Sequence, residues 1–334
     1  MKQNNPTPSN TTPKIAGALF FFLIILLWNI PTTHAEDDFA LWLEKLKQEA
    51  HAGGISPRTT EQAFHNVALN PQIIELDRNQ PEFKRTLEQY LSAVVTKGRV
   101  DTGRAKLVEK QELLKIIAKQ YGVPPRFVLA LWGIETNFGT ITGKSPVINS
   151  LVTLAYDARR GPYFRRELIH ALHIIDAGHM TVNEMLGSWA GAMGYLQFMP
   201  STFRGNAVDF DNNGKISLWE DGADLFASGS NYLKKSGWQT GWTWGREVLL
   251  PKGLDSGLIA SQKLPLEQWR QLGVRKADGS DLAGAAITAR IIQPDGPQGR
   301  AFMVYDNFDV ILTWNRSYSF GIAVGLLADA IGGI

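Results

Sequence analysis

The sequence predicts a mainly helical protein of the α+β class, with a small β-rich part near its C-terminal end. Residues 36–118 place apolar side chains at helical spacing almost without interruption, beginning with the stretch 39–46. Residues 119–246 alternate short helical stretches with glycine-rich turns. Residues 247–312 carry short β-branched and apolar runs separated by turns, which is typical of strands. An apolar stretch in residues 313–334 is then expected to return to the core as a helix.

The first 35 residues predict an export signal. Lys2 and Lys14 supply positive charge, and the 14 apolar residues that follow, 15–28, are fewer than the roughly 20 needed to span a membrane. Ala35 offers the small residue that a signal peptidase prefers. We therefore expect a periplasmic or secreted protein, with an uncleaved membrane anchor as the alternative.

Charge and cysteine content exclude several kinds of partner. Removal of residues 1–35 leaves 32 basic and 32 acidic residues, because that segment holds two of the 34 lysines and arginines and none of the 32 acids. A net charge near zero gives no overall field that would hold nucleic acid or an acidic membrane. The chain has no cysteine, so no lipid anchor on an N-terminal cysteine is expected. Its ten tryptophans offer apolar faces that suit sugar rings as well as protein cores.

One glutamate stands at an unusual point of a predicted helix. Pro125 suits the first turn of this helix and Gly139 suits its C-terminal cap. Counting in fours places Phe127, Leu131 and Glu135 on one face, so the acid ends an apolar stripe near the negative end of the helix dipole. Both features should raise its pKa, as a general acid requires. A glutamate whose stem packs while its head reaches water fits the pattern equally well.

No second carboxylate is evident beside Glu135. Asp157 is the acid nearest downstream, but Arg159 and Arg160 follow it closely and favour an ion pair. Glycosidases ordinarily use two carboxylates. A single carboxylate that first donates and then accepts a proton would instead fit attack by a hydroxyl of the substrate itself.

Residues 209–220 match the EF-hand pattern D-x-[DN]-x-[DN]-G-x₅-E at every specified position. The spacing predicts a structural calcium ion, with oxygen ligands from Asp209, Asp211, Asn213, the Lys215 carbonyl, Ser217 and Glu220. A chance acidic turn is the alternative. No organic cofactor is expected.

Several motifs in one order resemble the lytic murein transglycosylases of type B, known in membrane-bound and soluble 35-kDa forms. The resemblance covers about residues 38–328 and is carried by segments 132–136, 188–201, 209–220, 231–232 and 314–317. It implies a lysozyme-like fold with a helical core domain, a helical lobe and a small β domain. It also implies cleavage of the β-1,4 bond between N-acetylmuramic acid and N-acetylglucosamine. In that reaction the muramoyl C6 hydroxyl attacks C1 and forms a 1,6-anhydro ring, and Glu135 matches the acid that later becomes the base.

The same resemblance implies which residues line the cleft around that acid: Ser188, Met193, Tyr195, Gln197, Phe198, Tyr232 and Asn315. Trp314 and Phe320 depart from the tyrosines of the best-known member, so two hydroxyls are lost. Glycan strands of peptidoglycan, together with cell-wall synthesis complexes, are the implied partners of a monomer. Two further functions stay open at this point: a hydrolytic muramidase, and a non-catalytic calcium-dependent protein that binds cell-wall glycan.

Overall fold

The structure is a computed structural model that describes residues 33–79, 85–259 and 261–333. It divides into two compact units, Met1–Leu41 and Trp42–Ile334. The described part of the first unit is the beginning of helix α1 (Thr33–Ala52). The predicted export signal therefore lies almost wholly outside the described residues. Within the described ranges, no helix is long and apolar enough to cross a membrane.

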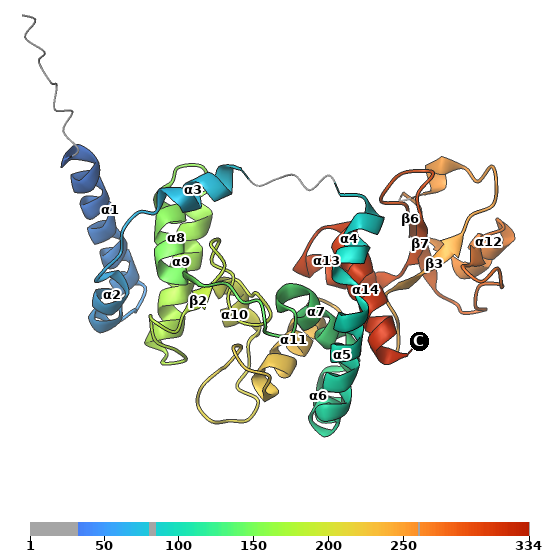
Figure 1. Ribbon diagram of the computed structural model, residues 1–334, viewed down its shortest axis with the longest axis horizontal. Helices are drawn as coiled ribbons and strands as arrows, with labels where there is room; N and C mark the ends of the chain where they lie inside the picture. The colour runs from blue at the N-terminus through green and yellow to red at the C-terminus, as the bar shows by residue number, and fades with distance from the viewer. Residues whose placement is uncertain (1–32, 80–84, 260, 334) are drawn as a thin grey trace, which may run out of the picture. The chain divides into compact units, whose positions relative to one another are not determined.

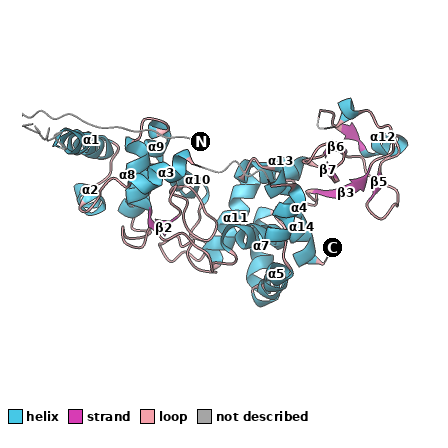
Figure 2. Ribbon diagram, turned by 45° about the horizontal axis from the view of Figure 1, so that its top comes forward, coloured by secondary structure: helices cyan, strands magenta, loops and turns pink. Residues whose placement is uncertain are grey.

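The mainly helical class is confirmed. In the part of the chain that the structure describes there are fourteen α-helices and seven short strands (Figures 1 and 2). The helices that follow α1 are α2 (Pro57–Phe64), α3 (Pro71–Arg78), α4 (Leu87–Val94), α5 (Lys97–Glu109) and α6 (Gln111–Tyr121). Side-chain oxygens of Ser56, Asn70, Thr86 and Thr96 accept backbone N–H groups and cap the first four of these.

Helix α7 (Pro125–Thr136) is the central helix of the second unit. It packs against α5, α6, α11 (Ala223–Lys235) and α14 (Tyr318–Gly332). All seven residues 127–133 are buried, so the helix is enclosed on every side rather than on one apolar face. This explains why its sequence is apolar almost throughout.

A second group of helices surrounds the pair α8 (Val147–Tyr156) and α9 (Gly161–Asp176). Helix α3 packs on α8, while α2 and α10 (Pro200–Asn206) pack on α9. The short strands β1 (Ser145–Pro146) and β2 (Leu186–Gly187) pair antiparallel beside α8.

The predicted β-rich part is one antiparallel sheet of order β4-β6-β7-β3-β5, drawn in magenta beside α12 in Figure 2. Its strands are β3 (Gly245–Leu249), β4 (Leu264–Pro265), β5 (Arg275–Lys276), β6 (Thr288–Ile292) and β7 (Ala301–Val304). Helix α12 (Leu266–Gln271) contributes the fully buried Trp269 to the core of this sheet, and the indole N–H donates to the Ala289 carbonyl at 2.9 Å.

The sheet ends earlier than the sequence predicted. Helix α13 (Asp306–Trp314) begins two residues after β7, so the last residues of the predicted β-rich stretch 247–312 are helical. Asp306 and Asp309 lie in its first turn, where acidic groups stabilise a helix N-terminus. Helix α14 follows and is buried along most of its length, as predicted for the returning segment.

Candidate functional site

Glu135 lies one residue before the end of α7, at a tightly constrained turn. Three consecutive residues there have positive φ: Asn137 at 49°, Phe138 at 56° and Gly139 at 82°. Asn137 caps the helix, and its N–H donates to the carbonyl four residues back at 3.1 Å. The predicted cap at Gly139 is therefore wrong. Asparagine tolerates the left-handed conformation, so α7 closes two residues earlier.

Thr136 fixes this turn to a distant segment. Its buried hydroxyl donates to the Tyr195 carbonyl at 2.9 Å and accepts from the Gly139 N–H at 3.2 Å. A Cβ at Gly139 would lie 2.6 Å from the Tyr195 ring, so only glycine fits there. The Tyr195 ring in turn stacks on Trp132 at 5.9 Å. These contacts hold the end of α7, and hence the Glu135 backbone, against the segment 188–200.

The Glu135 carboxyl group has one polar side-chain partner among the described residues. The Trp314 indole N–H donates to Glu135 Oε1 at 3.0 Å. Burial raises the pKa of Glu135 from 4.5 to about 7, and the hydrogen bond from Trp314 lowers it in part. The predicted direction is confirmed, with burial as the largest cause. A carboxyl group with this pKa can both donate and accept a proton near neutral pH.

Tyr90, on α4, is a neighbour that the sequence did not reveal. Burial raises the pKa of Tyr90, the charge of Glu135 raises it further, and Arg99 lowers it. The phenol therefore stays protonated while Glu135 titrates. Nothing in the sequence around Tyr90 separates it from an ordinary core aromatic residue of an amphipathic helix.

Ser188 and Gln197 have local backbone partners. Ser188 Oγ accepts from the Ala192 N–H at 3.0 Å, and Gln197 Nε2 donates to the Gly194 carbonyl at 2.9 Å. Gln197 also adopts a positive φ of 48°. In the described part of the chain, the Ser188 O–H and the Gln197 side-chain carbonyl have no partner. They keep one donor and one acceptor that a ligand could use.

Two predicted cleft residues lie in the core instead. Met193 and Phe198 are 0% and 2% exposed, so neither offers surface to a ligand, whereas Tyr195 is half-buried. They pair with each other across a β-bridge, which turns both side chains inward. The Phe198 ring packs against the Trp314 ring, with 5.2 Å between the ring centres, and so helps to fix the position of Trp314.

Tyr232 contacts the Trp314 indole, and Asn315 follows Trp314 in the chain. The Tyr232 hydroxyl donates to the Thr313 carbonyl at 2.7 Å, and its ring meets that of Trp314 edge-on at 4.8 Å. Asn315 is exposed, and its Oδ1 accepts from the Ser317 N–H at 3.0 Å. Tyr232 therefore positions Trp314, while the Asn315 amide nitrogen is left without a partner among the described residues.

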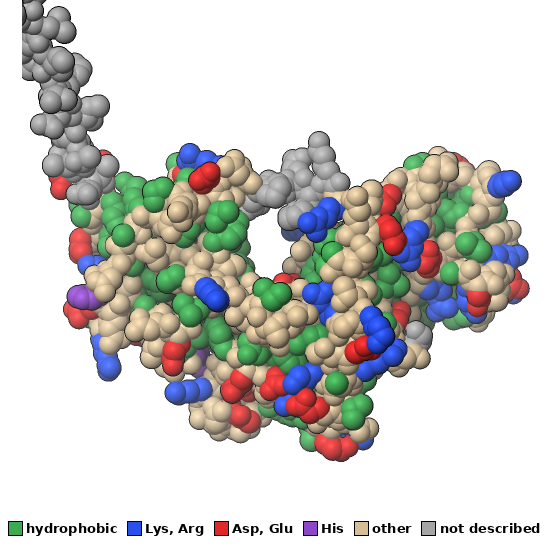
Figure 3. Space-filling model, in the orientation of Figure 1, with side chains coloured by type: hydrophobic (Ala, Val, Ile, Leu, Met, Phe, Trp, Pro, Cys, Tyr) green, Lys and Arg blue, Asp and Glu red, His purple; other side chains and the backbone are tan. Residues whose placement is uncertain are grey.

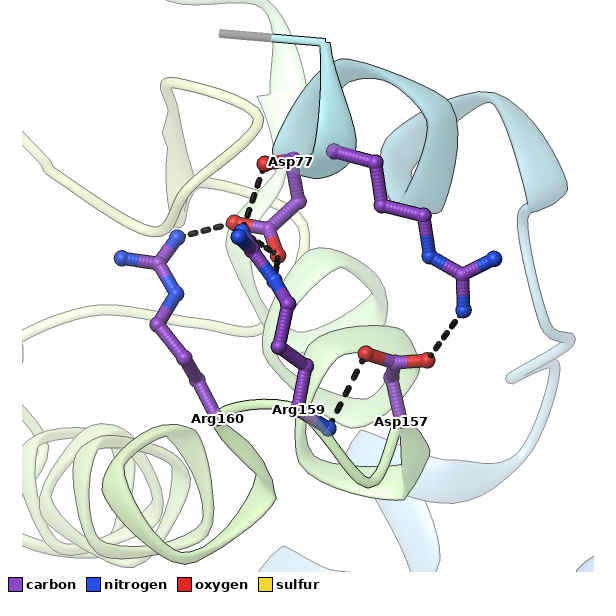
Figure 4. A network of polar contacts seen from close by, with 5 residues as sticks. Asp77, Asp157, Arg159 and Arg160 are labelled. Atoms are coloured by element: carbon purple, nitrogen blue, oxygen red, sulfur yellow. Dashed lines mark hydrogen bonds and ion pairs between the residues drawn. The ribbon is translucent and has the colours of Figure 1, made fainter.

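Asp157, the nearest downstream acid, forms an ion pair as predicted, but not with the predicted arginines (Figure 4). It pairs with Arg78 at 3.0 Å and accepts from the Arg159 backbone N–H at 3.3 Å. Arg159 and Arg160 instead bind the buried carboxylate of Asp77. These contacts fasten α3 to the end of α8, and they leave Asp157 no role beside Glu135.

The molecular surface is hollowed between the group of helices around α8 and helix α4 (Figure 3). Figure 3 shows the hollow between α8 and α4, above α7 in that view. Basic and acidic side chains are interspersed on this face, in keeping with the near-zero net charge of the chain after residue 35.

The predicted calcium loop brings together a different set of acids from the one predicted. Ligand oxygens of Asp209, Asp211 and Asp224 lie within 4.8 Å of one another, whereas the exposed Glu220 is not part of this group. The exit helix α11 begins only at Ala223, so the carboxylate that reaches the loop comes from its first turn. The ligand set with Glu220 stays a prediction, and Asp224 is the third carboxylate that lies beside Asp209 and Asp211.

The other predicted loop residues shape the turn. Asn213 Oδ1 accepts from the Lys215 N–H at 2.9 Å, Gly214 has φ 87°, and the Ser217 N–H donates to Asp224 at 2.9 Å. Burial raises the pKa of Asp224, and the neighbouring charges of Asp211 and Asp209 raise it further. A cluster of three carboxylates, of which only Asp224 is buried, fits a hard cation that takes oxygen ligands.

Comparisons with known proteins agree with this geometry. The family model of the transglycosylase SLT domain matches residues 38–329. The chain belongs to this transglycosylase family. It is 31% identical to membrane-bound lytic murein transglycosylase B of Escherichia coli (strain K12) over 257 residues, which span 73% of this chain and 66% of that enzyme.

Solved structures of similar fold include two transglycosylases. SltB3 from Pseudomonas aeruginosa, in complex with NAG-anhNAM-pentapeptide, matches with a TM-score of 0.85 and 41% identity over 88% of this chain and 80% of that chain. Slt35 from Escherichia coli, in complex with calcium, matches with a TM-score of 0.74 and 27% identity over 88% of this chain and 92% of that chain. The resemblance to type B lytic murein transglycosylases and the lysozyme-like fold are thereby confirmed.

Proposed function

We propose that this chain is a lytic transglycosylase that cleaves the β-1,4 bond between N-acetylmuramic acid and N-acetylglucosamine in peptidoglycan. The observation that carries the proposal is the half-buried side chain of Glu135, whose carboxyl pKa is raised to about 7 by desolvation and lowered in part by one indole N–H. No other carboxylate of the described residues acts on that pKa. The matched transglycosylase family supports the same reaction.

In the proposed reaction Glu135 first donates a proton and then accepts one. Protonated Glu135 donates its proton to the glycosidic oxygen as the bond to C1 breaks and positive charge develops at C1. The resulting carboxylate then takes the proton of the muramoyl C6 hydroxyl while that oxygen bonds to C1. The products are a free N-acetylglucosamine hydroxyl and a 1,6-anhydromuramoyl end, so no water is consumed and Glu135 returns to its starting state.

Substrate contacts are proposed for the polar groups left without a partner. The Ser188 O–H, the Gln197 carbonyl and the Asn315 amide could bond N-acetyl and hydroxyl groups without a competing charge. Tyr195, half-buried beside the turn of α7, offers an aromatic surface to a sugar ring.

Digestion of purified cell wall tests the reaction. Mass spectrometry should find 1,6-anhydromuramoyl ends, and Glu135→Gln should release no fragments. Products heavier by one water molecule, with reducing ends, would identify a hydrolytic muramidase instead. Unchanged release by Glu135→Gln would leave a glycan-binding role for Glu135 and reject the acid–base mechanism.

We further propose that the loop 209–224 holds a structural calcium ion. Asp209, Asp211 and Asp224 would supply carboxylate oxygens, joined by Asn213, Ser217 and the Lys215 carbonyl. The ion would offset the mutual repulsion of these acids and so stabilise the folded state. The complex of the similar Slt35 with calcium supports this assignment.

Export to the periplasm remains a proposal that is supported by the charge and apolar run of residues 1–35. Fractionation of cells that express the full chain tests it. A processed protein in the periplasmic fraction is expected, and an unprocessed protein in the membrane fraction would indicate the anchor instead.

A further inference from the structure

The indole of Trp314 is held rigidly where it meets Glu135. The ring packs between Phe198 at 5.2 Å and Tyr232 at 4.8 Å. The Tyr232 hydroxyl bonds the carbonyl of Thr313, the residue before the indole, at 2.7 Å. These contacts restrain the ring and the backbone next to it, so the N–H is aimed at Glu135 Oε1 before any substrate binds.

An indole N–H differs from a hydroxyl in one respect that matters here. It donates a hydrogen bond but cannot accept one. A tyrosine hydroxyl in its place could donate to either oxygen of the acid or accept the acid's own proton. The Oε1 that accepts from Trp314 therefore serves as the carbonyl oxygen of the neutral acid, and the proton belongs on Oε2.

We infer that Trp314 is a positioning residue that reserves Glu135 Oε1 as an acceptor and so makes Oε2 the only oxygen that exchanges the catalytic proton. This inference rests on the proposed acid–base function of Glu135. The same atom then delivers the proton to the glycosidic oxygen and later receives the proton of the attacking hydroxyl. The N–H also stabilises the carboxylate that exists between these two steps, where burial would otherwise disfavour it.

The other titratable and charged groups around Glu135 do not compete for this role. Tyr90 on α4 stays protonated because its pKa is raised, and Arg99 on α5 acts on Tyr90. The Tyr232 hydroxyl on α11 donates its hydrogen bond to the Thr313 carbonyl. In the described residues around the site, Glu135 is thus the group that changes charge near neutral pH.

The test compares Trp314→Phe with Trp314→Tyr by the pH dependence of kcat/KM. Loss of the N–H in Trp314→Phe should raise the pKa of Glu135. The alkaline limb of the profile, where kcat/KM falls because Glu135 ionises, should therefore move up by about one pH unit, which corresponds to the free energy of one hydrogen bond to a charged group. Because the N–H already donates to the acid, its loss should lower kcat about tenfold while KM stays within about twofold. Trp314→Tyr restores a donor and should return the limb toward its original pH.

A matched control removes a similar bond elsewhere. The Trp244 indole donates to the Asp329 carboxylate at 2.9 Å within the core, so Trp244→Phe loses the same kind of contact away from Glu135. Its alkaline limb should not move. Circular dichroism verifies that each variant is folded at the assay temperature.

Three outcomes would overturn the inference. The first is an alkaline limb of Trp314→Phe that does not move, and the second is a limb that moves equally in Trp244→Phe. The third is a loss confined to KM, which would make Trp314 a sugar-binding surface. Carbon-13 NMR titration of Glu135 in the wild type and Trp314→Phe reads the same pKa difference without turnover. The inference can therefore be judged even if product analysis rejects the proposed transglycosylase reaction.

Discussion

Replacement of Glu135 by glutamine should stabilise the protein in a strongly pH-dependent way. Burial raises the pKa of Glu135 from 4.5 to about 7. At about 1.36 kcal/mol for each pH unit between these values, the folded state loses about 3 kcal/mol once the acid is fully ionised. The glutamine side chain has the same shape, keeps an oxygen for the Trp314 N–H, and carries no charge to bury.

The pH window follows from the sign of the change. Below pH 4.5 the acid is protonated in both the folded and unfolded states and costs nothing. Between 4.5 and about 7 the unfolded state ionises first, so wild-type stability falls as pH rises. Above about 7 the loss is complete and constant. Glu135→Gln lacks this loss, so its advantage should be about 3 kcal/mol larger at about pH 8.5 than at about pH 4.

Urea unfolding, followed by circular dichroism at both pH values with calcium held constant, measures the effect. The comparison between variants at each pH cancels the contributions of all other titrating groups. Glu112→Gln, on an exposed face of α6, is the control and should change little at either pH. An equal difference between wild type and Glu135→Gln at both pH values would refute the buried, raised-pKa acid.

Four further substitutions test other parts of the site and core. Asp224→Asn should abolish the rise in Tm that calcium produces, whereas Glu220→Gln should keep it. Calorimetry with and without a chelator measures both variants. The reverse pattern would make Glu220, rather than Asp224, the ligand. Thr136→Val strips the Tyr195 carbonyl and the Gly139 N–H of their partner, so urea unfolding should find a loss of about 1–3 kcal/mol and the assay a lower kcat. Gly325→Ala puts a Cβ 2.2 Å from the Trp244 ring and should cost at least about 1–3 kcal/mol in urea unfolding; an unchanged midpoint would contradict the tight packing of α14.

The sequence predicted most reliably what depends on local spacing. The helical regions, the small sheet and the position of Glu135 on its helix all follow from periodicity and from the proline that begins α7. The raised pKa of Glu135 also followed, because an acid in line with Phe127 and Leu131 must share their buried surroundings.

Contacts between distant segments could not be predicted. Trp314 and Glu135 are 179 residues apart, and their hydrogen bond exists only because α13 and α14 return to α7. From the sequence, Trp314 was interpreted as a position that lacks the hydroxyl of a tyrosine. In the structure its indole N–H donates a hydrogen bond to Glu135, which a tyrosine hydroxyl could also do. Tyr90 was missed for a related reason, since its helix meets the site only through tertiary packing.

Helix boundaries and burial also depend on packing that local spacing does not reveal. The EF-hand spacing selected Glu220, but the exit helix starts three residues later and Asp224 turns into the loop. Met193 and Phe198 belong to a segment that does border the site, yet a bridge between them turns both into the core. Spacing alone identifies such a segment but not which of its side chains face the ligand.

The products of cell-wall digestion test the central claim most directly. If Glu135 alone serves as acid and then base, each cut should leave a 1,6-anhydromuramoyl end and incorporate no oxygen from water labelled with oxygen-18. Reducing muramoyl ends that carry the label would contradict the account, because they require water rather than the C6 hydroxyl as the attacking group.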